Sequence, residues 1–136
     1  MSAARRFASA AEACIGVPFR LHGRSRATGL DCVGLVVCAL SDSGIAAVAP
    51  DRYALRNLAI DRHLPLVARN GFREAGGAIL RGDLLLVTPG PAQHHLVVAS
   101  GPNAFVHAHA GLRRVVRQTS LLVWPILHHW RLAGQE

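Results

Sequence analysis

The stretch GLDCVGLVVCAL (residues 29–40) places an acid and a thiol, Asp31 and Cys32, directly before a long apolar run. Asp is a frequent N-cap residue, so the pattern predicts a buried helix from about residue 32 to residue 42 that ends before Gly44. At the first turn of a helix, unpaired backbone N–H groups and the helix dipole stabilise a thiolate, the nucleophilic form of Cys. Cys32 is therefore a candidate nucleophile, although a Cys in such a run more often serves as a small buried hydrophobic residue.

Two histidines strengthen this interpretation. His95 and His107 lie on the consecutive strand-like runs HHLVVASG and AFVHAHAG. In a hairpin centred on Gly101, Val97 pairs with Phe105, and the two histidines lie directly opposite each other on one face of the sheet. One imidazole then orients the other. A Cys with a His base and a polar third residue is the arrangement of a thiol hydrolase.

The remaining histidines leave a metal site as an alternative. The HAH segment places His107 and His109 on one strand face, and with His95 and Cys32 they could bind zinc tetrahedrally. Against zinc, the chain has no C-x-x-C and no H-E-x-x-H, and it also lacks the G-x-S-x-G of many serine hydrolases. We therefore predict thiol chemistry without a metal or a cofactor. The histidines interpreted as surface features are His94, expected on the face opposite His95, and the pair His128 and His129.

The segments around these residues predict an α+β fold. Residues 3–15 have apolar side chains at helical spacing, residues 16–30 indicate a loop, and residues 55–71 indicate an amphipathic helix kinked near Pro65. Five β-rich runs follow, at 83–90, 94–101, 104–111, 113–120 and 121–130. Helices followed by strands favour helices packed on an antiparallel sheet, in a single domain spanning residues 1–136.

Composition limits the classes of partner. All fifteen basic residues are Arg and the net charge is +7, which favours carboxylate or phosphate groups, but the arginines are scattered with few aromatic residues among them. No nucleic-acid surface is therefore predicted. The longest run without a polar residue, 32–40, is far shorter than the roughly 20 residues of a membrane span, and Glu12 interrupts the signal-like N-terminus. We expect neither a membrane span nor an export signal. The three cysteines cannot all pair, so no disulfide framework is expected.

Three segments, IGVPFRLHGRSRATGLDCVGLV, GDLLLVTPGPAQHHLVVAS and FVHAHAG, resemble the NlpC-type peptidoglycan cysteine peptidases, in particular the branch carried by phages and gene transfer agents. The resemblance spans roughly residues 10–118. It implies a papain-like α+β fold in which the helix that begins with the catalytic Cys packs on the antiparallel sheet. Through the family's D-C-x-G motif it makes Cys32 the nucleophile. Through the strands that follow, it makes His95 the general base in preference to His94, and His107 the orienting residue.

One position departs from the family pattern. The family usually has a Tyr after the Pro of the upstream loop, where its hydroxyl helps to hold the oxyanion, but this chain has Phe19. The oxyanion would then rely on the backbone N–H of Cys32 and on another donor, for which His22 is a candidate. Losing one such donor can cost about 100-fold or more in rate. The residues considered for the oxyanion and for substrate carboxylates are Asp31, Phe19, His22, Arg20 and Arg24.

The resemblance also implies a substrate and a setting. The substrate would be the peptide stem of peptidoglycan, typically the amide bond between D-glutamate and diaminopimelate. The partners would be tail-tip or baseplate proteins of a phage-like particle. The enzyme would be made in the cytoplasm, assembled into the tail, and act in the periplasm or cell wall. Two alternatives remain: a structural tail-tip component of the same fold with little or no activity, and another thiol amidase or acyltransferase.

Overall fold

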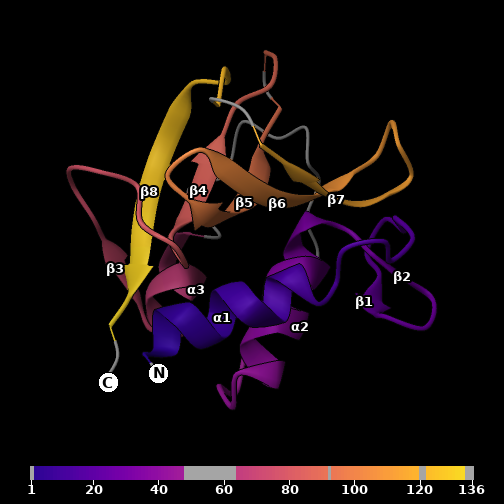
Figure 1. The fold of residues 1–136 in the computed structure, drawn as a ribbon, viewed down its shortest axis with the longest axis horizontal. Helices are drawn as coiled ribbons and strands as arrows, with labels where there is room; N and C mark the ends of the chain where they lie inside the picture. Colours follow the sequence, from indigo (N-terminus) through magenta and orange to yellow (C-terminus); the bar gives the residue numbers. More distant parts are fainter. Residues whose placement is uncertain (1, 48–63, 92, 120–121, 134–136) are drawn as a thin grey trace.

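The computed structural model describes residues 2–47, 64–91, 93–119 and 122–133. Its largest element is a six-stranded antiparallel sheet with helices packed on one face (Figure 1). In spatial order the strands are β3 (Phe72–Glu74), β8 (Ile126–Leu132), β4 (Leu84–Val87), β5 (His95–Gly101), β6 (Ala104–His109) and β7 (Arg114–Gln118). The helices are α1 (Ala3–Glu12), α2 (Cys32–Asp42) and α3 (Leu64–Arg69), and a separate hairpin consists of β1 (Arg24–Ser25) and β2 (Gly29–Leu30).

Both faces of the central strands are buried, which explains why LLLV in β4 shows no alternation. Alternate side chains pack against α1 and α2 in the larger core, among them Leu84, Leu86, Val98 and Val106. The residues between them form a second, smaller cluster on the opposite face, consisting of Leu85, Val87, Val97, Ala99 and Phe105. Residues two apart along a strand share a face, so His95 and His107 lie on the face of this second cluster.

Helix α2 is the central helix that the sequence predicts. It spans residues 32–42 as expected, and Leu35, Ala39 and Leu40 are completely buried against the sheet and α1. Helix α1 lies beside it (Figure 1), and its Phe7 meets Phe72 of β3 edge to face with ring centroids 5.4 Å apart. Within the described residues, no helix is both long and apolar enough to cross a membrane.

Several shorter elements differ from the predicted ones. The 16–30 loop contains the β1–β2 hairpin, and β3 was not predicted, because strands of two or three residues carry too little alternation to recognise. The last strand begins at Ile126 rather than 121, after Pro125, which cannot donate to a sheet. Helix α3 contains Pro65 as its second residue, a position where a helix tolerates Pro. The rest of that predicted helix, 55–63, lies outside the described residues.

The β5–β6 hairpin has a different register from the predicted one. Phe105 pairs with Ala99, where the predicted register paired it with Val97, and an irregularity in the pairing precedes the turn. The predicted register was therefore wrong by two residues. A shift of two preserves the alternation of side chains between the faces. His95 and His107 consequently share one face as expected, but they are not directly opposite each other.

Candidate active site

The loop before α2 is held by the buried carboxylate of Asp31. Asp31 accepts hydrogen bonds from the backbone N–H of Gly34 at 2.8 Å and of His22 at 2.7 Å, and it forms an ion pair with Arg24 Nη1 at 3.2 Å. The bond from Gly34 confirms the predicted N-cap. The bond from His22 fixes that residue at φ 61°, a left-handed conformation that is uncommon outside Gly. Asp31 thus holds the loop and the start of α2 together.

The Gly of the D-C-x-G segment is required by close packing. A Cβ on Gly34 would lie 1.9 Å from the carbonyl oxygen of Gly23 in the loop. No larger residue fits there unless the backbone moves. The loop therefore rests directly on the first turn of α2, which is the turn that begins with Cys32.

Cys32 is the first residue of α2, and its side chain is only 1% exposed. The backbone N–H groups of Leu96, Val33 and Cys32 itself lie near its sulfur and favour the thiolate. Burial, with a smaller contribution from the Asp31 carboxylate, nevertheless raises the pKa of the thiol to about 12. The predicted lowering of this pKa at the helix N-terminus was therefore wrong, because desolvation outweighs the N–H groups. At neutral pH Cys32 is a neutral thiol.

The sulfur of Cys32 lies at the start of β5. Pairing between β5 and β6 begins only at Val98. The backbone N–H of Leu96, two residues earlier, lies near the sulfur. Leu96 directly follows His95 in the chain. The sulfur on α2 therefore contacts the backbone next to the predicted base, at the point where β5 and β6 separate.

His95 and His107 form a hydrogen-bonded pair. His95 Nε2 and His107 Nδ1 are 2.9 Å apart, and the two rings meet edge to face with centroids 5.0 Å apart. Burial, with smaller contributions from the neighbouring His107 and His109, lowers the pKa of His95 to about 3. Burial also lowers the pKa of His107. Both rings are therefore neutral at neutral pH, the state that a general base requires before the reaction.

The tautomers of the two rings decide whether His95 can accept a proton. Only one of the two facing nitrogens carries the hydrogen between them. When His95 Nε2 donates, His95 Nδ1 is the free acceptor, and the proton of His107 is on Nε2. That Nε2 is buried, without a hydrogen-bond partner at ordinary distance among the described residues. The Gln118 side chain of β7 interacts with His107 and favours its protonated form. Its amide oxygen is thus suited to stabilise the tautomer that leaves His95 basic.

Gln118 was missed in the sequence analysis. It pairs with Phe105, two residues from His107 in β6, and therefore lies on the same face of the sheet as His107. The alternating patterns of the two strands contain this information. They could have identified Gln118 only with the β6–β7 register, which depends on the turn between the strands.

The two histidines line a hollow of about 410 Å³. Its lining residues are Pro89, Gln93, His94, His95, His107, His109, Ala110 and Trp124. Trp124 packs edge-on against both rings of the pair, with centroids 5.9 Å and 5.7 Å away. The prediction that His94 points away from His95 was wrong. The reason is that β5 begins at His95, so the alternation of the strand does not extend to His94.

The residues considered for the oxyanion and the substrate lie in the loop rather than in this hollow. Phe19 packs against the larger core and forms a β-bridge with Leu30. The side chains of His22 and Arg20 are exposed, and Arg24 is engaged by Asp31. The donors that the structure does place at the sulfur are backbone N–H groups.

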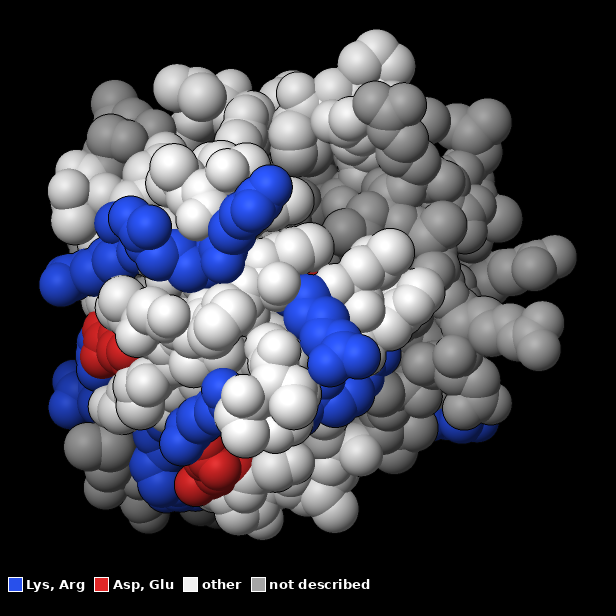
Figure 2. All heavy atoms as spheres, turned by 90° about the vertical axis from the view of Figure 1, so that its right-hand side faces the viewer, with Lys and Arg blue, Asp and Glu red and all other residues white. Residues whose placement is uncertain are grey.

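Arginine side chains gather on the face formed by β1, β2 and β7 (Figure 2). A β-bridge between Pro18 and Arg114 brings the loop before α2 beside β7. The exposed arginines of these strands and of the adjoining loops are Arg20, Arg26, Arg113, Arg114 and Arg117. A positively charged surface therefore adjoins the loop that precedes the candidate nucleophile.

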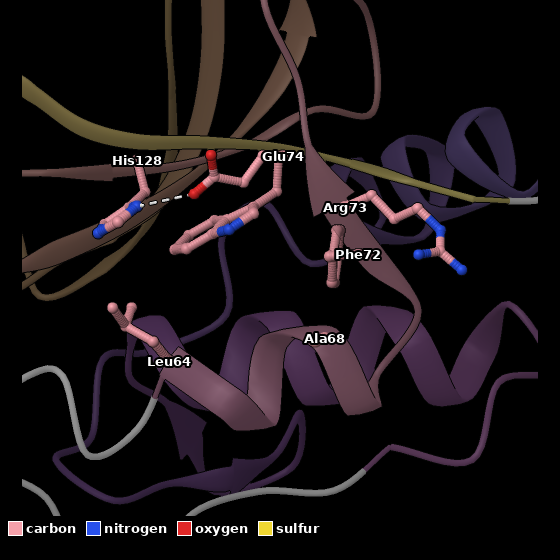
Figure 3. A pocket seen from close by; sticks show the side chains of 7 residues that line it. Leu64, Ala68, Phe72, Arg73, Glu74 and His128 are labelled. Atoms are coloured by element: carbon pink, nitrogen blue, oxygen red, sulfur yellow. Dashed lines mark ion pairs between the residues drawn. The ribbon is translucent and has the colours of Figure 1, made fainter.

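A second hollow, of about 330 Å³, lies between α3, β3 and β8 (Figure 3). Glu74 and His128 face each other across it at 3.6 Å, and His128 stacks on Trp130 with ring centroids 5.2 Å apart. His129 Nε2 bonds to the buried Asp83 at 2.6 Å. The interpretation as a surface feature was therefore wrong for His129, which bonds to a buried carboxylate, whereas His128 is partly exposed beside the exposed Glu74. This hollow is not lined by a Cys or by the histidine pair.

The residues of the zinc alternative have other contacts. The facing nitrogens of His95 and His107 bond to each other at 2.9 Å. Among the described residues, no three His, Cys, Asp or Glu side chains are gathered in a way that could hold a metal ion. The two imidazoles instead bond to each other on the face of the sheet opposite α2, and the Cys32 sulfur lies near the backbone of Leu96, next to His95.

A thiol at a helix N-terminus beside a histidine-bearing antiparallel sheet defines the papain-like class of proteins. The model of the NlpC/P60 family matches residues 16–125. The chain therefore belongs to the NlpC/P60 family. The predicted α+β, papain-like NlpC-type fold is confirmed.

Several solved structures share this fold. NlpC2 from Trichomonas vaginalis has a TM-score of 0.69 and 19% identity over 99% of this chain and 48% of that chain. The peptidoglycan hydrolase RipB from Mycobacterium tuberculosis has a TM-score of 0.66 and 21% identity over 98% of this chain and 66% of that chain. An N-acetylmuramoyl-L-alanine amidase from Bacteroides uniformis has a TM-score of 0.65 and 13% identity over 96% of this chain and 98% of that chain.

The present chain spans about half the length of the Trichomonas protein. No curated protein sequence matches it significantly. At these levels of identity the similarity to solved structures establishes the fold alone.

Proposed function

We propose that this protein is a peptidoglycan hydrolase that cleaves amide bonds of the stem peptide as a cysteine peptidase. The observation that carries the proposal is the buried Cys32 sulfur against the N–H of Leu96, next to His95, which is in turn bonded to His107 at 2.9 Å. Membership of the NlpC/P60 family supports it. So do the names of two proteins with the same fold, a peptidoglycan hydrolase and an N-acetylmuramoyl-L-alanine amidase.

The protonation states set the order of events in the proposed reaction. Because the pKa of Cys32 is raised to about 12 and that of His95 is lowered to about 3, the resting pair is neutral. His95 Nδ1 takes the thiol proton while the sulfur attacks the amide carbonyl carbon. The tetrahedral intermediate then collapses, and the proton leaves with the amine. Water, activated by the same imidazole, hydrolyses the thioester and restores the thiol.

Backbone N–H groups at the start of α2 are the proposed oxyanion donors. Phe19 has no donor of its own and packs against the larger core. The N–H of Cys32 lies near the sulfur in the first turn of α2, where unpaired N–H groups stabilise negative charge. The His22 side chain, which is exposed on the same loop, is the second donor we propose to test.

The scissile bond and the biological setting are proposed from the resemblance of the sequence to the phage and gene transfer agent branch of the family. We propose the bond between D-glutamate and diaminopimelate as the scissile bond and a phage-like tail, with tail-tip or baseplate proteins, as the setting. On this proposal the protein is made in the cytoplasm and acts on the wall from the periplasmic side. The exposed arginines beside the loop, Arg20 first among them, suit the free carboxylates of the stem.

The test is digestion of purified sacculi by the full chain under reducing conditions, with released fragments identified by mass spectrometry. We expect wild type to release stem-peptide fragments and Cys32→Ala to release none. Cys38→Ala, which removes a thiol on the same helix away from the histidines, should act like wild type. If neither wild type nor Cys32→Ala releases fragments, the alternative of a structural tail-tip component without activity would be favoured. Cleavage between N-acetylmuramic acid and L-alanine would favour the amidase.

A further inference from the structure

Two thiols that the proposed reaction does not use lie together between α1 and α2. Cys14 follows the C-terminal end of α1 and is completely buried, whereas Cys38, in the middle of α2, is half-buried. Cys14 lies close enough to Cys38 to raise the pKa of the Cys38 thiol. The two side chains are therefore neighbours in the fold although they are far apart in the sequence. We refer to Cys14 and Cys38 as the thiol pair.

A charged pair of side chains surrounds the thiol pair. Arg26 Nε donates to Cys14 Sγ at 3.4 Å, and the other end of its guanidinium forms an ion pair with Asp42. Cys38 Sγ donates to the same Asp42 carboxylate at 3.9 Å. As a thiol, Cys14 can also donate to the Ala10 carbonyl at 3.5 Å. Both sulfurs are thus in contact with one Arg–Asp pair.

The two sulfurs have unequal environments. The Arg26 guanidinium contacts the Cys14 sulfur, whereas the Asp42 carboxylate contacts the Cys38 sulfur. Burial, the neighbouring Cys14 and the Asp42 carboxylate raise the pKa of Cys38 to about 11. Cys38 is the member of the pair with more contact with solvent.

We propose that Cys14 and Cys38 are a site of disulfide formation, closed by exchange with a small-molecule disulfide. The accessible Cys38 sulfur, losing its proton, attacks the oxidant RSSR, forms Cys38–S–S–R and releases one RSH. Cys14, whose sulfur lies against the Arg26 guanidinium, then loses its proton, attacks the Cys38 sulfur and expels RS⁻, which takes up that proton. In sum, two thiols and one RSSR give one intramolecular disulfide and two RSH. Cys32, buried on the first turn of α2, keeps its thiol.

The disulfide would connect the end of α1 to the helix that presents Cys32. It would enclose the loop that carries Asp31 and Gly34, because both residues lie between positions 14 and 38. Closing a loop of this length restricts the unfolded chain, so a melting temperature higher by about 5 °C or more is expected in the oxidised protein. The site lies outside the proposed reaction and does not depend on it.

The test is equilibration of the folded full chain with reduced and oxidised glutathione, followed by alkylation and peptide mass spectrometry. We expect a mass decrease of two hydrogen atoms, a cross-linked peptide containing Cys14 and Cys38, and alkylation of Cys32 only after unfolding. In Cys14→Ser, the Cys38 thiol should instead carry a glutathione adduct. Glutathione adducts without a cross-link in the wild type, or a disulfide that includes Cys32, would overturn the proposal.

A second pair of variants tests the role of the guanidinium. Arg26→Gln removes the cation from Cys14 and should slow the closing of the disulfide by about tenfold. Arg73→Gln, an exposed Arg of β3, is the matched control and should close at the wild-type rate. Equal rates in both variants would contradict the assignment of Cys14 as the attacking sulfur. All of these measurements are independent of peptidase activity, so they separate this proposal from the proposed function.

Discussion

The position of one proton distinguishes two forms of the proposed reaction. A thiolate–imidazolium pair would attack directly, whereas a neutral thiol must lose its proton during the attack. Burial of Cys32 and His95 favours the neutral form of each group, and the three N–H groups at the sulfur do not offset it. The structure therefore favours general-base catalysis, as in a serine hydrolase, over a preformed ion pair.

The neutral thiol predicts slow alkylation of Cys32. A pKa raised to about 12 leaves a much smaller thiolate fraction at pH 8 than an ordinary Cys has, and 1% exposure limits access as well. Iodoacetamide should label Cys32 in the folded protein about 100-fold more slowly than in the unfolded chain. Quantitative peptide mass spectrometry at several times measures both rates. Labelling at the unfolded rate would show that a thiolate exists at rest.

The second prediction at this scale concerns Gln118. If its amide oxygen accepts from His107 Nε2, Gln118→Leu should lower kcat/KM on a stem peptide by about tenfold, the effect of one lost hydrogen bond. Gln118→Glu keeps an acceptor and should retain more activity. Its charge should also move the acidic limb of the pH–rate profile to higher pH.

Thr119→Val is the control for Gln118, because Thr119 is the exposed residue that directly follows it. It should leave both the rate and the pH profile near those of wild type. An unchanged kcat/KM in Gln118→Leu would mean that His107 is oriented without help from β7.

At the scale of elements, β4 and β8 are joined at one end by a buried carboxylate. Asp83, at the start of β4, bonds to His129 Nε2 at 2.6 Å and to Arg131 Nε at 2.7 Å, and it accepts from the backbone of Leu80 at 2.8 Å. Although burial alone would raise the pKa of Asp83, the hydrogen bonds from Arg131 and His129 lower it overall. The carboxylate is therefore charged and satisfied by its neighbours.

Asp83→Ala should destabilise the fold. It leaves the partly buried side chains of His129 and Arg131 without their acceptor, at an expected loss of about 3 kcal/mol in the free energy of unfolding. Glu74→Ala is the control, because that side chain is 79% exposed and forms an ion pair with the partly exposed His128. It should change the free energy of unfolding by about 0.5 kcal/mol or less. Urea unfolding followed by circular dichroism measures both values, and similar losses would contradict the role of Asp83.

The sequence is more informative about elements with long patterns than about those set by contacts. The apolar run after Asp31 was enough to predict α2 and its cap, and alternation placed His95 and His107 on one face. The register of β5 with β6 and the contact of Gln118 with His107 depend on an irregularity and on a turn, which have no periodic signal. The pKa of Cys32 depends on how deeply the sulfur is buried, which its sequence neighbours do not determine.

At the scale of the whole molecule, the sheet separates two environments. Helices α1 and α2 cover one face (Figure 1), which contains the larger core. The other face carries the smaller cluster and the histidine pair. Cys32 belongs to a helix on the first face and reaches the strand that bears His95 where β5 and β6 separate. The proposed chemistry thus depends on the packing of the entire sheet against α2 rather than on one loop.

The buried imidazoles make the stability of the molecule depend on pH. His95 titrates near 6.5 when unfolded, but burial lowers its pKa to about 3 in the folded state. Between these values the unfolded chain binds a proton that the folded chain does not, so the free energy of unfolding decreases as pH falls from about 6.5 towards 3. One such site contributes at most about 1.4 kcal/mol per pH unit. The lowered pKa of His107 acts in the same direction.

Substituting His95 tests this dependence. In His95→Gln, the decrease in unfolding free energy between pH 7 and pH 5 should be smaller than in wild type, because one of the two groups with a lowered pKa is gone. His22→Asn removes an exposed imidazole at a left-handed position that Asn tolerates, and it should show the wild-type decrease. Urea unfolding at each pH gives these differences. The same pH dependence in wild type and His95→Gln would mean that His95 is protonated in the folded protein and is not the neutral base that the reaction requires.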